Sequence, residues 1–134
     1  MFRRSRLAML CAMQFTRDFR LDINLIRSHT TGALVIGDQT YTSNLILSPS
    51  QIMPDWAVAS TEFLTIEQLK DALAMKPGIL LLGTGELQTF PDPELMAAVM
   101  GLGIGLEVMD TAAACRTYNI LASENRPVVA ALII

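Results

Sequence analysis

The sequence predicts an α/β protein whose central sheet is largely parallel and whose N-terminal β-hairpin lies across one face as an extra layer. Two observations support this class. From residue 65 onward, helical and strand patterns alternate, which is typical of successive right-handed crossovers. Within that stretch, residues 79–82 form an aliphatic run without polar alternation, as in a strand that is covered on both faces.

The composition bounds the protein class. The chain of 134 residues has the length of one domain, which we assign to residues 14–134. Hydrophobic residues make up 51% and charged residues 17%, which favours a packed aliphatic core over disorder. A formal charge of −3 indicates no nucleic-acid partner. Cys11 and Cys115 lie far apart and form no zinc or disulfide pattern, so we expect no metal and no cofactor.

The N-terminus needs its own interpretation. Arg3, Arg4 and Arg6 precede the short apolar residues 7–13, in a pattern that mimics a signal peptide. The apolar stretch is at the lower limit of length and no small-residue cleavage site follows it. We therefore interpret residues 1–13 as a flexible N-terminal extension. No apolar run reaches the roughly 20 residues of a membrane span, so we expect none. The two isolated cysteines suit a reducing cytoplasm, and we expect a cytoplasmic protein. The sequence does not indicate the oligomeric state.

The region before the alternation reads as a β-hairpin and a short strand. Residues 33–36 form the first strand, residues 37–39 the turn and residues 40–47 the returning strand. Residues 56–59 form a further short apolar strand. We expect the hairpin to supply the extra layer.

The first helix begins at Thr65. Gln68 follows three residues later, as in a capping box, and the glycine at Gly78 ends the pattern. The central strand over residues 79–82 comes directly afterwards.

Two further helices alternate with strands. Asp92 precedes a proline at the first helical position of the second helix. Asp110 or Thr111 caps the third. Residues 104–108 and 127–134 form the strands that follow the second and third helices.

The topology predicts where a site lies. The carboxyl ends of parallel strands meet at one edge of a sheet, so the loops that follow them converge there. The polar residues of these loops are Ser60 and Thr61 in the first, Gly83, Thr84 and Gly85 in the second, and Asp110 and Thr111 in the third.

Each loop has a functional and a structural interpretation. Gly83, Thr84 and Gly85 can cradle an anion on backbone N–H groups, or they can form a tight turn. The fingerprint of a dinucleotide loop is absent, because no third glycine or immediate helix follows. Asp110 and Thr111 can hold a ligand at the positive end of the third helix, or they can cap it.

Polar side chains on the neighbouring elements complete the candidate set. Tyr118 and Asn119 on the third helix are candidate ligand-binding residues, although the Tyr118 ring is also suited to packing. Glu107 lies in a strand that we expect to be covered on both faces, so its carboxylate needs a partner. Arg126 or Arg116 can supply one, and we expect a structural ion pair.

No set of side chains in the sequence indicates a particular reaction. His29 is the only histidine, and it lies in a polar stretch without an acid or nucleophile at recognisable spacing. Cys115 lies on an alanine-rich helix face and is expected to be a small core residue. We therefore predict no catalytic residues and lean against an enzyme.

The chain resembles the Mth-like domain-of-unknown-function family over residues 32–132. The matching residues are Ile36, Gly37, Tyr41, Asn44, Pro49, Pro54, Trp56, Gly83, Thr84, Gly85, Glu107, Met109, Thr111, Ala114, Thr117, Tyr118, Asn119, Leu121, Glu124 and Arg126. That family includes the mitochondrial assembly factor three of respiratory complex I, the adipogenesis-associated Mth-like domain proteins and many bacterial members. The resemblance implies a three-layer β/β/α fold with a central mixed sheet and helices on one side, and it brings no established catalytic mechanism.

Two functions are consistent with these observations. The first is a non-enzymatic binding or assembly module with a protein partner, which by family analogy acts in respiratory-complex assembly. The second is a small-molecule or anion-binding protein, or an enzyme, that uses the loops at the carboxyl ends of the parallel strands.

Overall fold

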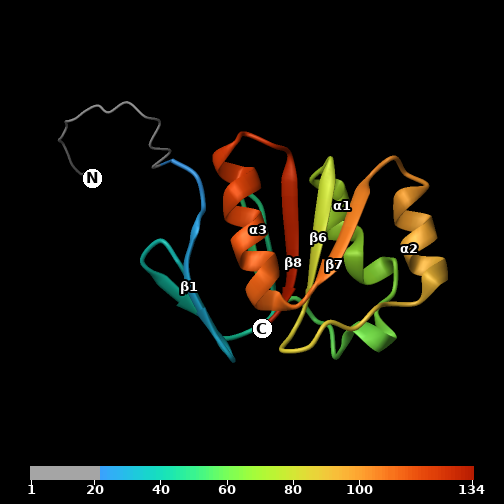
Figure 1. Ribbon diagram of the computed structural model, residues 1–134, viewed down its shortest axis with the longest axis horizontal. Helices are drawn as coiled ribbons and strands as arrows, with labels where there is room; N and C mark the ends of the chain where they lie inside the picture. Colours follow the sequence, from blue (N-terminus) through green and yellow to red (C-terminus); the bar gives the residue numbers. More distant parts are fainter. Residues whose placement is uncertain (1–21) are drawn as a thin grey trace.

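The computed structural model describes residues 22–134, and both the proposed N-terminal extension and Cys11 lie outside this range. The described chain forms two separate sheets (Figure 1). The smaller sheet is antiparallel with the order β1-β2-β3. Its strands are β1 (Ile26–Thr30), β2 (Ala33–Ile36) and β3 (Gln39–Tyr41).

The larger sheet has five strands in the order β5-β4-β8-β6-β7. β6 is parallel to both of its neighbours, β7 and β8, whereas β4 is antiparallel to β8 and to β5. The predicted α/β class with a mixed, largely parallel sheet is therefore confirmed, as is a separate N-terminal antiparallel layer. The strands are β4 (Leu45–Leu47), β5 (Ile52–Pro54), β6 (Ile79–Thr84), β7 (Gly105–Met109) and β8 (Val128–Ile133).

The helices cover both faces of the larger sheet (Figure 1). The expectation that they lie on one side of the sheet is therefore corrected. α3 and the smaller sheet share one face, and α1 and α2 pack on the other. The parallel strands are therefore covered by apolar side chains on both faces. The helical segments are η1 (Thr61–Phe63), η2 (Glu67–Leu69), α1 (Lys70–Ala74), α2 (Pro93–Met100) and α3 (Thr111–Ser123).

The aliphatic run of β6 supplies residues to both cores. Leu81 packs in the core beneath α3 and the smaller sheet, while Leu80 and Leu82 pack in the core beneath α1 and α2. All three side chains are almost completely buried. Burying a leucine stabilises a fold by about 1.5–3 kcal/mol relative to leaving it exposed. The predicted central strand thus contributes to the cores on both faces of the larger sheet.

The predicted returning strand over residues 40–47 is divided between the two sheets. β3 ends the smaller sheet and β4 enters the larger one, with Asn44 between them. The Asn44 side chain donates to the carbonyl of Val58 and accepts from the backbone N–H of Ile134, at 3.1 and 2.8 Å. A pattern of apolar residues does not show this change of sheet, because it depends on contacts with distant segments.

The predicted strand at residues 56–59 does not form, and β5 over Ile52–Pro54 takes its place beside β4. Trp56 is instead buried against α1 and α2, and its indole N–H donates to the carbonyl of Gln68 at 2.8 Å. In segment 56–59, the buried Trp56 side chain holds the loop against the core, and no strand is formed.

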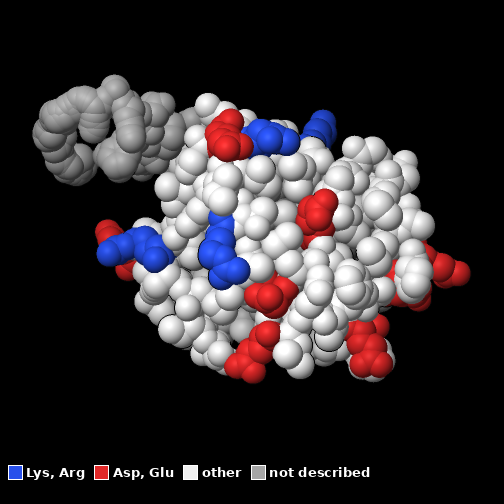
Figure 2. Space-filling model, viewed as in Figure 1, with Lys and Arg blue, Asp and Glu red and all other residues white. Residues whose placement is uncertain are grey.

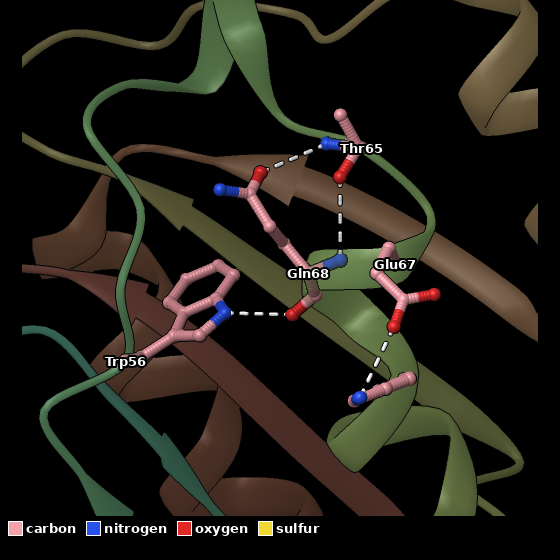
Figure 3. Close-up of polar contacts among 5 residues, drawn as sticks. Trp56, Thr65, Glu67 and Gln68 are labelled. Atoms are coloured by element: carbon pink, nitrogen blue, oxygen red, sulfur yellow. Dashed lines mark hydrogen bonds and ion pairs between the residues drawn. The ribbon is translucent and has the colours of Figure 1, made fainter.

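The predicted capping box is present before α1 (Figure 3). The Gln68 side chain accepts from the backbone N–H of Thr65 at 3.0 Å, and the Thr65 hydroxyl accepts from the N–H of Gln68 at 3.3 Å. The helix itself is shorter than predicted, because the first turn is the 3₁₀ segment η2. Gln68 also donates to the carbonyl of Ala57 at 3.1 Å, so it joins the cap to the Trp56 loop.

Replacing Gln68 with alanine is expected to lower the free energy of unfolding by about 1–2 kcal/mol, because two side-chain hydrogen bonds are lost together. Urea denaturation followed by circular dichroism measures the change. Lys70→Ala is the matched control, since Lys70 pairs with Glu67 at 3.0 Å on the exposed face. Equal shifts for the two variants would show that the cap has no special role.

Candidate functional site

The parallel strands β6, β7 and β8 end on the same side of the larger sheet, and segment 59–63 lies beside the ends of β6 and β8 (Figure 1). We call this region the carboxyl edge. It contains a cavity of about 460 Å³ between segment 59–62 and the loop after β6. The predicted convergence of loops is thus seen in the structure. The lining residues are Ala59, Ser60, Thr61, Glu62, Thr84, Thr89, Phe90 and Ile133.

Thr84 at the end of β6 uses its hydroxyl to hold the following loop. Its Oγ donates to the carbonyl of Leu87 at 2.6 Å and accepts from the N–H of Thr89 at 3.2 Å. The carbonyl of Met109 on β7 lies 3.3 Å away. Thr84 is buried, so these bonds compensate the desolvation of its hydroxyl. The residue closes the loop that it begins.

Thr111 closes the loop from the other side. Its Oγ accepts from the N–H of Gly85 at 2.8 Å and donates to the carbonyl of Ile133 at 2.5 Å. Its own backbone N–H donates to the carbonyl of Gly85 at 2.9 Å. One buried hydroxyl therefore joins the ends of β6 and β8 to the start of α3.

The two glycines of the loop have separate structural reasons. A Cβ on Gly83 would lie 3.2 Å from the backbone Cα of Thr111 and 3.0 Å from its Oγ, so the close approach of α3 to β6 excludes a side chain. Gly85 has a φ of 95°, which favours glycine. Since the Gly85 N–H already donates to Thr111, the loop is tied to α3 and does not present this group to an anion.

Asp110 begins α3. Its carboxylate accepts from the backbone N–H of Ala113 at 2.9 Å, which is the bond of an N-cap. Both the Asp110 and the Thr111 side chains therefore have partners within the protein. The structural alternative for these residues accounts for their contacts.

Tyr118 and Asn119 do not line this cavity; they join α3 to β1 and to the segment before it. The buried Tyr118 hydroxyl donates to the carbonyl of Asn24 at 2.7 Å. Burial raises the pKa of this hydroxyl, so it remains a protonated donor. The Asn119 amide accepts from the N–H of Ile26 at 2.9 Å and donates to the carbonyl of the same residue at 2.8 Å.

The expected ion pair between Glu107 and Arg126 is not formed among the described residues. β7 is an edge strand, and Glu107 on it is exposed, so its carboxylate needs no buried partner. Arg126 lies 3.9 Å from Glu124 instead. The expectation assumed that both faces of this strand are covered, whereas the structure leaves Glu107 exposed.

Cys115 is a buried core residue. Desolvation raises the pKa of its thiol to about 11, against a smaller opposing effect of Arg116. The thiol is therefore protonated at neutral pH and is a weak nucleophile. Cys115 also lines a cavity of about 240 Å³ between β1 and α3. His29 and Arg27 of β1 line the same cavity.

Exposed apolar side chains at the carboxyl edge were missed by the sequence reasoning. Phe63 is 70% exposed, Leu87 75% and Phe90 60%. Phe90 lines the cavity, and Phe63 directly follows Glu62, which also lines it. The signal was present in the sequence, because two large apolar residues interrupt the loop between Gly85 and the second helix.

Replacing Thr84 with valine is expected to destabilise the protein by about 1–3 kcal/mol, since the loop loses three hydroxyl contacts in a buried position. Thermal denaturation measures the loss. Thr84→Ser retains the hydroxyl and should restore most of the stability. If valine left the stability unchanged, Thr84 would not be the residue that holds the loop.

The comparison with protein families identifies the domain. The family model described as protein of unknown function (DUF498/DUF598) matches residues 26–133. The chain belongs to this family. The solution structure of a Bordetella pertussis protein described as a Mth938-like domain matches with a TM-score of 0.76 and 27% identity, over 90% of this chain and 92% of that one. The resemblance to the Mth-like family is therefore confirmed.

Curated relatives carry two kinds of name. The NADH dehydrogenase [ubiquinone] 1 alpha subcomplex assembly factor 3 of Xenopus tropicalis is 33% identical over 108 residues, which is 76% of this chain. This chain spans 56% of the length of that assembly factor. The 13 kDa major membrane protein of Francisella tularensis subsp. holarctica is 31% identical over 103 residues, covering 76% of this chain and 84% of the relative. Within residues 22–134, every helix is too short or too polar to cross a bilayer.

Proposed function

We propose that this DUF498/DUF598 protein is a non-enzymatic binding module that acts through a protein partner in the assembly of a larger complex. The curated assembly factors among its relatives support the assembly role. By analogy with those relatives, the complex is a respiratory one. Cytoplasmic location remains part of the proposal and is consistent with the free, buried Cys115.

The observation that carries the proposal is the contrast between polar and apolar groups at the carboxyl edge. The hydroxyls of Thr84 and Thr111 have partners within the protein, whereas Phe63, Leu87 and Phe90 are exposed. Exposed aromatic and aliphatic side chains gathered in one place are typical of protein interfaces.

Affinity capture from native cells tests the proposal. The tagged full chain is expressed at its normal level, and bound proteins are quantified by mass spectrometry against an unrelated bait of similar size. We expect a reproducible partner that also co-migrates with the chain on size-exclusion chromatography. Failure to recover any partner across independent cultures and crosslinking conditions would count against an assembly role.

A metabolite library provides the opposing test. Amide chemical shifts of the full chain are followed during titration with each compound. A compound that moves the signals of residues 59–62 and 84–90 at micromolar concentration would favour the small-ligand function over the assembly role. Under the proposal, we expect no such saturable shift.

A further inference from the structure

Part of the carboxyl edge combines exposed apolar residues with acidic ones. We call this part the aromatic–acidic surface. Phe63, Leu87 and Phe90 are all at least 60% exposed. The acidic residues Glu62, Glu86 and Asp92 are also exposed. The surface consists of Glu62, Phe63, Glu86, Leu87, Phe90 and Asp92.

The charge of this surface has a single sign. Segments 59–63 and 84–94 contain acidic residues but no lysine or arginine. On the face shown in Figure 2, the lower margin carries red acidic side chains and no blue basic ones. In Figure 1 the loop after β6 lies along the same margin. A surface of this kind attracts cationic groups and repels phosphates.

The cavity behind the surface offers room for a side chain. Its volume is about 460 Å³, and both Phe90 and Ile133 contribute apolar lining. Ser60, which also lines it, has a buried Oγ without a hydrogen-bond partner among the described residues. Ser60 precedes η1 but its side chain makes no capping bond. Buried hydroxyls normally have a partner, so Ser60 leaves one hydroxyl unsatisfied beside the cavity.

We propose that the aromatic–acidic surface binds a segment of a partner protein in which an apolar side chain is flanked by lysine or arginine. The apolar side chain enters the cavity, and the basic groups pair with Glu62 and with Glu86, whose carboxylate also accepts from the Thr31 hydroxyl at 2.7 Å. This inference rests on the proposed function and adds the binding surface and the chemistry of the partner. Charge complementarity selects this occupant over nucleic acid or an anionic membrane, both of which present phosphate groups.

The basic groups determine specificity more than affinity, because both carboxylates are exposed to water and salt. Most of the affinity is expected to come from the aromatic contacts, since large apolar side chains dominate protein interfaces. The two contributions can therefore be separated by mutation and by salt concentration.

Selection from a phage-displayed library of short random peptides tests the chemistry of the segment. The bait is the full chain, and selected peptides are titrated by fluorescence anisotropy. We expect selected sequences to be enriched in lysine or arginine next to leucine or phenylalanine. The amide signals of residues 59–63 and 84–92 should shift on binding. Selected peptides that are acidic or neutral, or shifts confined to another face, would overturn the proposal.

Matched variants test the surface itself. Phe63→Ser with Phe90→Ser is expected to weaken peptide binding by about tenfold or more. Glu62→Lys with Glu86→Lys should weaken it by a smaller factor, and mainly at low salt, where the charges are least screened. The control is Met100→Ser with Leu102→Ser, which removes two exposed apolar side chains at the end of α2. Circular dichroism confirms that each variant is folded before titration.

The same variants distinguish this inference from the proposed function. If the full chain captures its partner and the Phe63→Ser, Phe90→Ser variant captures it equally well, the assembly role stands and the surface is wrong. If the wild-type chain captures no partner, the proposed function itself fails. If the α2 control loses binding as strongly as the surface variant, the partner occupies a different or wider face, and the inference is overturned.

Discussion

Replacing Gly83 with alanine is expected to lower the free energy of unfolding by about 2–3 kcal/mol. The added Cβ would lie 3.2 Å from the Cα of Thr111 and 2.9 Å from a methyl group of Leu132. Leu132 is fully buried in the core, and Thr111 is held by its hydrogen bonds to Gly85 and Ile133. The start of α3 therefore has to move away from β6. Chemical denaturation measures the change.

Gly105→Ala is the matched control for this prediction. Gly105 also lies in a parallel strand of the larger sheet, but the nearest atom to its added Cβ is 3.5 Å away, an ordinary contact. Its substitution should be neutral or stabilise the protein by up to about 1 kcal/mol, because an unfolded chain with alanine has less conformational entropy than one with glycine. Equal destabilisation by both substitutions would show that the approach of α3 does not restrict Gly83.

Replacing Tyr118 with alanine is expected to destabilise the protein by about 3–5 kcal/mol, which is the range for truncating a buried aromatic side chain. Tyr118 is fully buried in the core that joins α3, the smaller sheet and the larger sheet. The cavity left by its ring would separate these layers. The measurement is the urea midpoint, together with near-ultraviolet circular dichroism to report the packing of the remaining aromatic residues.

Tyr118→Phe separates the ring from the hydroxyl. The phenylalanine ring fills the same space, but the carbonyl of Asn24 loses its 2.7 Å hydrogen bond. We expect a loss of about 1–2 kcal/mol, well below that of Tyr118→Ala. If phenylalanine were as damaging as alanine, the hydrogen bond and not the packing would hold α3 to the N-terminal segment.

The sequence predicted the alternating half of the fold well, because its signals are local. The aliphatic run of β6 and the caps at Asp92 and Asp110 depend on residues within a few positions of each other. The first half was harder to predict. The chain passes from one sheet to the other at Asn44, whose bonds reach to Val58 and Ile134. No local pattern contains such long-range partners.

The sequence predicted that the loops converge, but of the candidate ligand-binding residues only Thr84 lines the cavity. The convergence of the loops after parallel strands follows from topology, and Thr84 does share a cavity with Ser60. The roles of the polar side chains did not follow, because their hydrogen bonds connect separate elements. Thr111 bonds to Gly85 and Ile133, and Asn119 bonds to Ile26. The ligand-binding interpretation of these residues remains a prediction.

The pair of hydrogen bonds between Asn119 and Ile26 also bears on the edge of the smaller sheet. β1 is an edge strand of the smaller sheet, and unpaired edges can recruit strands from other chains. The Asn119 amide offers the same donor and acceptor that a neighbouring strand would offer, and both groups of Ile26 are taken up by it. At this point one side chain of α3 substitutes for a fourth strand, and intermolecular β pairing there would first have to displace it.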